Sequence, residues 1–131
     1  MVCVMRKGHP AAFGALTLRA FLALRHLRIV QSAGDVRFVE EALLKSRLQR
    51  KVMATTQHWL TAFYIVERSD LVTALPESMV RRLNSDRRFV VASFPWAARS
   101  SHGVFTGHRR HDGRLAHRRL KAMFESVARE A

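Results

Sequence analysis

Four consecutive polar residues, Thr55, Thr56, Gln57 and His58, form the most site-like segment of this 131-residue chain. They bring two hydroxyls, an amide and an imidazole to the expected entry of a helix, where backbone N–H groups lack partners. Because a helix N-terminus favours negative charge, such a segment is suited to holding a small carboxylate. The same residues also fit a plain capping motif, in which Thr56 satisfies the first turn of the helix.

A second polar segment, residues 31–35, contains Ser32 and also lies between an expected strand and an expected helix. In parallel α/β sheets, loops of this kind meet at the carboxyl ends of the strands, where ligands bind. We therefore expect Ser32 and the segment from Thr55 to His58 to face one crevice.

Other chemistries have little support in the sequence. It contains no GxxxxGK[ST] or GxGxxG phosphate loop, no HExxH zinc motif and no GxSxG nucleophile elbow. His108, His111 and Asp112 lie close together, but no Cys or Glu completes a zinc set at a usual spacing. The single cysteine, Cys3, lies in an apolar run with no evident activating base. We therefore expect no enzyme activity, no bound metal and no cofactor.

The net charge is strongly positive, because 23 Lys and Arg face 10 Asp and Glu, which gives +13. This balance suggests an anionic partner, whether nucleic acid, anionic lipid or a small carboxylate. No apolar run approaches the roughly 20 residues that span a bilayer. The apolar stretch Val2–Met5 precedes Arg6 and Lys7, which is the reverse of signal-peptide order. We expect a cytoplasmic protein without a membrane partner.

Short strands and helices alternate along the chain, which indicates an α/β architecture with a largely parallel sheet. The predicted strands are Val2–Met5, Leu27–Val30, Lys51–Ala54, Leu71–Leu75, Arg88–Ala92 and His102–His108. The predicted helices run from a Thr17 cap to Ala23, over Val36–Arg47 after an Asp35 cap, from a Thr55-Thr56 cap through Val66, over Glu77–Leu83 after Pro76, and over Gly113–Arg129. The last helix carries an apolar side that needs burial, formed by Leu115, Leu120, Met123, Phe124 and Val127.

Several segments together resemble the effector-binding domain of LysR-type transcriptional regulators. Val2–Pro10 is similar to that family's strand ending in a His-Pro turn, and Asp70–Pro76 is similar to its D-L-V-A-x-L-P segment. Residues 108–120 resemble its C-terminal signature W-H-x-R-x-D-x-D-x-x-H-x-W-L-R, although Gly107 and Arg119 stand where the family usually has Trp. The order and spacing of these segments carry the resemblance over nearly the whole chain.

The resemblance implies a periplasmic-binding-protein-like fold of type 2, with two α/β lobes around an effector cleft. It assigns residues 1–13 to the end of the first lobe and residues 14–95 to the complete second lobe. Residues 96–131 would be the return strand and C-terminal helix of the first lobe. The family's N-terminal winged helix-turn-helix would be absent, so the fold is expected to be truncated, with one complete lobe and part of the other.

Carried over from the resemblance, Thr55, Thr56, Gln57 and His58 match the second-lobe turn that lines the cleft, and Ser32 lies on a neighbouring loop. The implied ligand is a small anionic effector, with an aromatic carboxylate as one candidate. The complete regulator would be a homo-oligomer that contacts DNA only through the missing domain. The residues leave one alternative open, a small basic protein that binds nucleic acid non-specifically.

Overall fold

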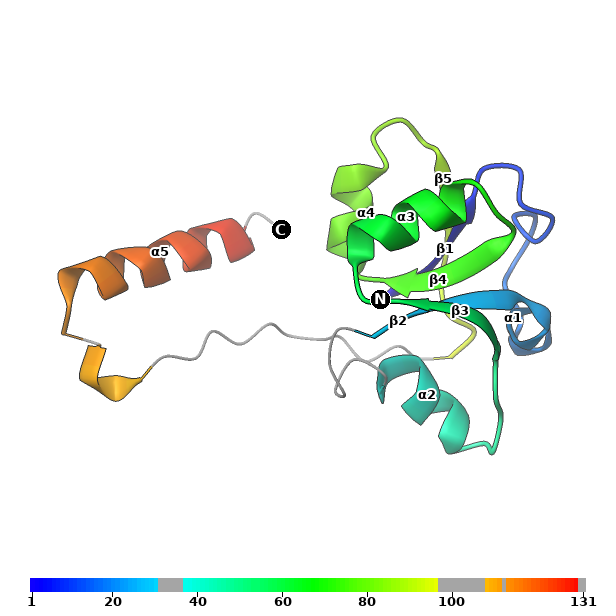
Figure 1. Ribbon diagram of the computed structural model, residues 1–131, viewed down its shortest axis with the longest axis horizontal. Coiled ribbons are helices and arrows are strands. Elements are labelled where there is room, and N and C mark those ends of the chain that lie inside the picture. Colours follow the sequence, from blue (N-terminus) through cyan, green and yellow to red (C-terminus); the bar gives the residue numbers. More distant parts are fainter. Residues whose placement is uncertain (31–36, 97–107, 112, 130–131) are drawn as a thin grey trace. The chain divides into compact units, whose positions relative to one another are not determined.

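The computed structural model of the chain describes residues 1–30, 37–96, 108–111 and 113–129. The chain divides into two compact units, residues 1–99 and residues 100–131, and each unit is described by itself. The first unit contains a sheet with helices on both of its faces, and the described part of the second contains two helical elements (Figure 1).

A five-stranded sheet in the order β3-β2-β4-β1-β5 forms the body of the first unit (Figure 1). β2 pairs in parallel with β3 and with β4, whereas β1 is antiparallel to both of its neighbours, β4 and β5. The strands are β1 (Val2–Arg6), β2 (Arg25–Ile29), β3 (Lys51–Thr56), β4 (Leu71–Leu75) and β5 (Phe89–Ala92).

The expectation of a largely parallel sheet is correct for β2, β3 and β4 but wrong at β1. Because β1 is antiparallel to both β4 and β5, those two strands share a direction, and β1 runs against all the others. Side-chain alternation looks the same whichever way a strand runs, so its direction is fixed only by the partners it finds. The partners of β1 are distant in sequence, as the pairs of Cys3 with Ala74 and with Ala92 show.

Two apolar layers hold the sheet between its helices. One layer joins Val2 and Val4 of β1 to the helices α3 and α4, and the other joins Cys3 and Met5 to α1 and α2. A strand buried on both faces reads as a continuous apolar run, which explains the sequence of β1. The helices are α1 (Leu18–Ala23), α2 (Arg37–Leu44), α3 (Trp59–Glu67), α4 (Glu77–Leu83) and α5 (Leu115–Arg129).

The predicted starts of α1 and α4 are confirmed. The Thr17 side chain accepts a hydrogen bond from the backbone N–H of Ala20 at 3.2 Å, so Thr17 is the N-cap of α1. Pro76 occupies the N-cap position of α4, and this helix ends at Leu83 as predicted.

The helix predicted over Val36–Arg47 is shorter at its C-terminal end than expected. Arg47 adopts a left-handed conformation with φ 53°, and the backbone N–H of Leu48 donates to the carbonyl of Leu43. This pattern closes a helix in the Schellman manner, where glycine is the usual residue. The sequence has Arg at this position, so the usual signal for the end is absent. The predicted Asp35 cap lies outside the described residues.

The described part of the second unit contains a short 3-10 helix, Arg109–His111, followed by α5. The predicted helix over Gly113–Arg129 is confirmed, with its start at Leu115. All five apolar residues predicted for one side of this helix are exposed, namely Leu115, Leu120, Met123, Phe124 and Val127. The strand predicted at His102–His108 lies outside the described residues except for His108, which is not in a strand.

The expected lobe boundaries differ from the divisions seen in the structure. A boundary at residue 13 separates β1 from the other strands, whereas in the structure β1 lies between β4 and β5 in one sheet. The boundary between the two compact units falls after Arg99. The assignment of residues to lobes of a longer protein stays a prediction.

Candidate functional site

The predicted polar segment lies at the junction of β3 and α3 (Figure 1). Thr55 and Thr56 are the last residues of β3, and His58 is the N-cap of α3. The side chains of Thr55, Gln57 and His58 are exposed, and Thr56 is half-buried. A ligand therefore has access to this junction from solvent.

The expectation that Thr55 and Thr56 cap the helix is wrong. His58 holds the N-cap position, and its side chain makes no capping hydrogen bond. The Thr56 hydroxyl accepts the backbone N–H of His58 at 3.3 Å, which stiffens the turn but does not reach the first turn of the helix. Both threonines stay in the strand because Val30 continues the pairing, donating its N–H to the Thr56 carbonyl at 2.9 Å.

Side-chain alternation divides the segment between the two faces of the sheet. Thr56 pairs in register with Ile29, which packs against the apolar layer under α3 and α4. Thr55 pairs in register with Arg28, and these two residues belong to the opposite face, where α1 and α2 lie. The two hydroxyls therefore serve different faces.

The ends of β2 and β3 lie side by side at one edge of the sheet, because the strands are parallel and Ile29 is opposite Thr56. Val30, directly after β2, therefore lies beside the polar segment. Ser32 lies outside the described residues.

Arg28 is a charged residue that the sequence analysis did not select. It lies near the end of β2, beside Thr55 of β3, and its Nε atom is buried with no hydrogen-bond partner. The signal in the sequence is the arginine itself, at an inward position of the otherwise β-forming run His26–Val30. An arginine in a short β-forming run is equally compatible with an exposed side chain, so the sequence alone does not mark Arg28 as a site residue.

His26 is a buried histidine with a structural role. Only 1% of the residue is exposed, and its Nε2 donates to the Phe21 carbonyl at 2.8 Å. Burial lowers the pKa of its imidazole to about 4, although the hydrogen bond to Phe21 acts to raise that pKa. At neutral pH the ring is uncharged and packs at 4.5 Å from the Phe21 ring.

His9, in the His-Pro turn after β1, ties that turn to the start of β4. Its Nδ1 accepts the backbone N–H of Ala11 at 3.0 Å, so the proton is on Nε2. That nitrogen donates to the Asp70 carbonyl at 3.2 Å. The Asp70 carboxylate accepts from Arg6 at 2.7 Å, which joins the same two segments again. His9 is therefore part of the scaffold.

Cys3 lies in the central strand β1 and is almost fully buried. Burial raises the pKa of its thiol to about 12, so the reactive thiolate is not formed near neutral pH. This environment is unlike that of a nucleophilic cysteine.

The histidines of the described residues can be compared with the needs of a metal site. Within these residues, the His, Cys, Asp and Glu side chains form no group of three that could hold a metal ion. His108 and His111 lie 6.2 Å apart between ring centroids, while Asp112 is outside the described residues.

Among the helices of the described part of the chain, none has the length and apolar character needed to cross a membrane.

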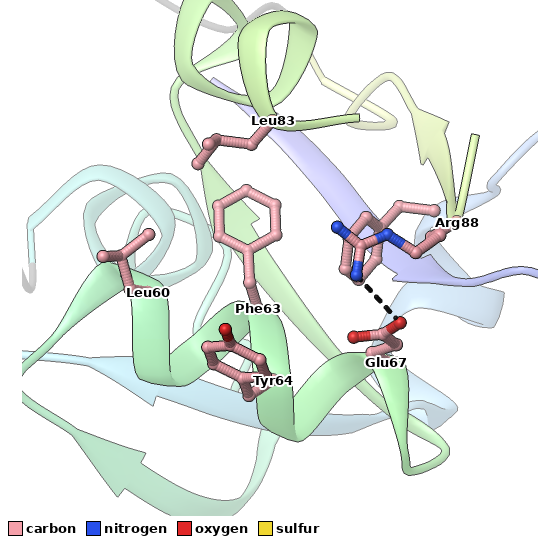
Figure 2. Close-up of a pocket in the computed structure, with 7 residues that line it drawn as sticks. Leu60, Phe63, Tyr64, Glu67, Leu83 and Arg88 are labelled. Atoms are coloured by element: carbon pink, nitrogen blue, oxygen red, sulfur yellow. Dashed lines mark hydrogen bonds and ion pairs between the residues drawn. The ribbon is translucent and has the colours of Figure 1, made fainter. Parts of the chain in front are cut away.

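A separate apolar hollow lies between α3, α4 and the start of β5 (Figure 2). Its volume is about 430 Å³, including the part open to solvent. Phe63 and Phe89 meet edge to face at 5.1 Å in its lining, and an ion pair from Arg88 to Glu67 at 3.1 Å lies at one side. The remaining lining residues are Leu60, Tyr64 and Leu83. None of the predicted site residues lines this hollow.

Comparison with known proteins gives one consistent result. The family model of the LysR substrate binding domain matches residues 1–129. The transcriptional regulator SyrM of Rhizobium meliloti is 30% identical over 131 residues, covering 98% of this chain and 40% of SyrM. The transcriptional activator NagR of a Ralstonia species is 26% identical over 81 residues, covering 62% of this chain and 27% of NagR. The chain thus spans less than half the length of these curated relatives.

Solved structures give the same result for the fold. The regulatory domain of MexT from Pseudomonas aeruginosa superposes with a TM-score of 0.71 at 23% identity, covering 92% of this chain and 60% of that one. A putative regulator from Vibrio parahaemolyticus gives 0.70 at 23% identity, covering 92% and 56%. A probable regulator from Pseudomonas aeruginosa gives 0.66 at 26% identity, covering 75% and 33%. The expected α/β fold of the periplasmic-binding-protein-like type 2 class is confirmed.

Proposed function

This chain belongs to the family of LysR substrate-binding domains, and from that premise we propose that it binds a small anionic effector at the adjoining ends of β2 and β3. The family is one of transcriptional regulators, which are generally not enzymes. The proposed activity is accordingly ligand sensing without chemical conversion of the ligand.

The observation that carries the proposal is that the parallel strands β2 and β3 end side by side at the polar segment from Thr55 to His58. Thr55 and Thr56 are the last residues of β3, and Val30, directly after β2, donates its N–H to the Thr56 carbonyl. Ligands of open α/β sheets bind outside the carboxyl ends of strands, which is where this segment lies. We propose Ser32, two residues after Val30 in the sequence, as a further ligand contact. Thr55, Gln57 and His58 are exposed there, so their donors are free to face a ligand.

A carboxylate suits this edge better than a neutral ligand. The hydroxyl of Thr55, the amide of Gln57 and the ring of His58 can each donate a hydrogen bond. The backbone at the start of α3 adds partial positive charge, because the His58 side chain does not cap it. The net charge of +13 favours the approach of anions in general.

In the whole regulator, we propose that binding changes the relation between subunits of a homo-oligomer. DNA would be contacted through a domain outside this chain, in the bacterial cytoplasm. A ligand can act in this way only if it binds one arrangement of the regulator more tightly than the other. The support is the family membership and the fraction of SyrM, 40%, that this chain spans.

The test measures binding of aromatic and aliphatic carboxylates to the full chain by thermal shift and calorimetry. Thr55→Val and Gln57→Ala should each weaken the strongest ligand about tenfold, as expected for loss of a charge-assisted hydrogen bond. Gln49→Ala is a matched control, because Gln49 is exposed and lies before the start of β3, at the other end of that strand from Thr55.

A different pair of results would contradict the proposed effector binding. If no carboxylate gives a saturable shift, and duplex DNA binds with a steep dependence on salt, the sensor proposal fails. Non-specific binding of nucleic acid by the basic surface is then the better description.

A further inference from the structure

Arg28 is the cationic residue nearest in register to the proposed site, and we propose that Arg28 and Thr55 together hold the carboxylate of the effector. This inference rests on the proposed function and adds to it the source of positive charge. It also selects a face of the sheet, the one covered by α1 and α2, because Thr55 and Arg28 share that face.

The register of β2 and β3 places the two side chains together. Arg28 and Thr55 are paired residues of neighbouring parallel strands, so their side chains leave the sheet on the same side. Leu27 and Ile29, the residues flanking Arg28, pack instead into the layer under α3 and α4. Arg28 and Thr55 therefore project from the same face of the sheet, on neighbouring strands near their carboxyl ends.

The guanidinium of Arg28 includes a buried donor that the described chain leaves without a partner. Its Nε is buried without a hydrogen-bond partner, and within the described residues no carboxylate forms an ion pair with it. A buried donor without an acceptor costs free energy that folding alone does not return. Arg50 shows the usual solution, because its buried side chain bonds to Glu40 at 2.6 Å. Among the residues that the structure describes, Arg28 has no such carboxylate, and a ligand can supply one.

A second buried donor without a partner belongs to the same face. It is the indole N–H of Trp96, whose residue packs in the layer with α1 and α2. The Trp96 ring lies 5.1 Å from the Phe21 ring, and the Phe21 ring lies 4.5 Å from His26, two positions before Arg28 on β2. Among the described residues, the two buried side-chain donors lacking partners are therefore both on this face.

A carboxylate fits these donors in geometry and in charge. Arginine presents parallel N–H groups that match two carboxylate oxygens, and the adjacent hydroxyl can donate a further hydrogen bond. A phosphate would share the attraction to arginine, but the sequence has no glycine-rich loop of backbone N–H groups. The group that Arg28 and Thr55 bind is therefore a carboxylate and not a phosphate.

The first experiment compares charged ligands with neutral ones of the same shape. Benzoate is paired with benzamide, and hexanoate with hexanamide, in calorimetric titrations of the full chain, with inorganic phosphate as a further anion. The intact chain should prefer the better carboxylate over its amide by about tenfold or more. Arg28→Met should remove that preference, and Arg28→Lys should keep part of it. Arg25→Met, an exposed arginine of the same strand, should leave it unchanged.

The outcomes separate this inference from the proposed function. If the carboxylate preference survives in Arg28→Met, Arg28 is not the anion-binding residue, although the proposed function stands. If phosphate binds in an Arg28-dependent way and carboxylates do not, the ligand class is wrong. If the intact chain binds no carboxylate at all, the proposed function fails and this inference falls with it.

The second experiment needs no ligand. Because the buried Nε of Arg28 has no partner among the described residues, Arg28→Met should raise the melting temperature of the free chain by about 4 °C. Arg50→Met should lower it, because that change leaves Glu40 without its partner. A lower melting temperature for Arg28→Met would mean that the guanidinium already has a partner in solution, and would overturn the inference.

Discussion

The imidazole of His26 is held neutral by its surroundings, with consequences for stability in acid. The ring is buried against Phe21, and the pKa of its imidazole lies at about 4 instead of the ordinary 6.5. Between these two pH values His26 binds a proton in the unfolded chain but stays neutral in the folded chain. Stability contributed by the neutral ring is therefore complete above about pH 6.5 and is lost as the pH falls towards 4.

The corresponding prediction is a loss of about 2–3 kcal/mol in the free energy of unfolding on going from pH 7 to pH 4. Urea unfolding at a series of pH values measures this loss. Other groups also titrate in this range, so the informative comparison is with His26→Gln, whose stability should depend less steeply on pH. An equal slope in the intact chain and in His26→Gln would contradict the assignment.

Single residues were predicted unequally well. Thr17 was identified correctly because an N-cap needs only a local pattern, a short polar residue before a helical run. Thr55 and Thr56 showed a similar pattern but remain in β3, since pairing with β2 competes successfully for their backbone. The unsatisfied state of Arg28 depends on which side chains surround it, and the local sequence contains no such information.

At the scale of elements, the existence of the strands was predictable and their directions were not. β4 was predicted with its observed bounds, Leu71–Leu75, because apolar runs closed by turn residues are local signals. The antiparallel direction of β1 depends on its position between β4 and β5. That position is set by contacts between segments far apart in the chain, which a reading of periodicity does not contain.

The cap of α1 allows a test at this scale. Thr17→Ala removes the hydrogen bond from Ala20 and should lower the free energy of unfolding by about 1 kcal/mol. Phe21, the buried residue of this short helix, contacts His26 and Trp96. Loss of the cap should therefore also weaken the packing of these two residues. Chemical unfolding of the full chain gives the measurement.

Two variants serve as references for the cap. Thr17→Ser keeps the hydroxyl and should be close to the intact chain, and Thr61→Ala changes an exposed threonine inside α3. Equal losses in Thr17→Ser and Thr17→Ala would show that the hydroxyl is not what stabilises α1.

At the scale of the whole molecule, the charge and the fold give different kinds of information. A net charge of +13 suggests an anionic partner but is compatible with nucleic acid and with a small ligand. The order of segments along the chain led to the family, which the comparisons confirm. The faces of the sheet, and hence the grouping of Arg28 with Thr55, required the structure.

Cys3 reports on the stability of the first unit as a whole. It lies in the central strand with 1% of its surface exposed, and burial raises the pKa of its thiol to about 12. Alkylation by iodoacetamide at about pH 8 should therefore be at least about 100-fold slower in the native chain than in urea. Mass spectrometry measures the labelled fraction over time.

The same experiment distinguishes global opening from local opening. Thr17→Ala should accelerate labelling about fivefold, the factor that corresponds to a loss of about 1 kcal/mol, if Cys3 is exposed only when the sheet opens. Labelling of the native chain at the unfolded rate would contradict the burial of β1.

The position of β1 in the sheet also sets a timetable for the chain during its synthesis. β1 leaves the ribosome before either of its partner strands. Cys3 can pair with Ala74 only after β4 has been synthesised, and with Ala92 only after β5. At about 5–20 residues per second, the wait for β5 lasts roughly 4–18 s. Throughout this interval an apolar strand built to be covered on both faces is without its neighbours. The interval in which β1 is made but lacks β4 and β5 therefore ends only when β5 has emerged.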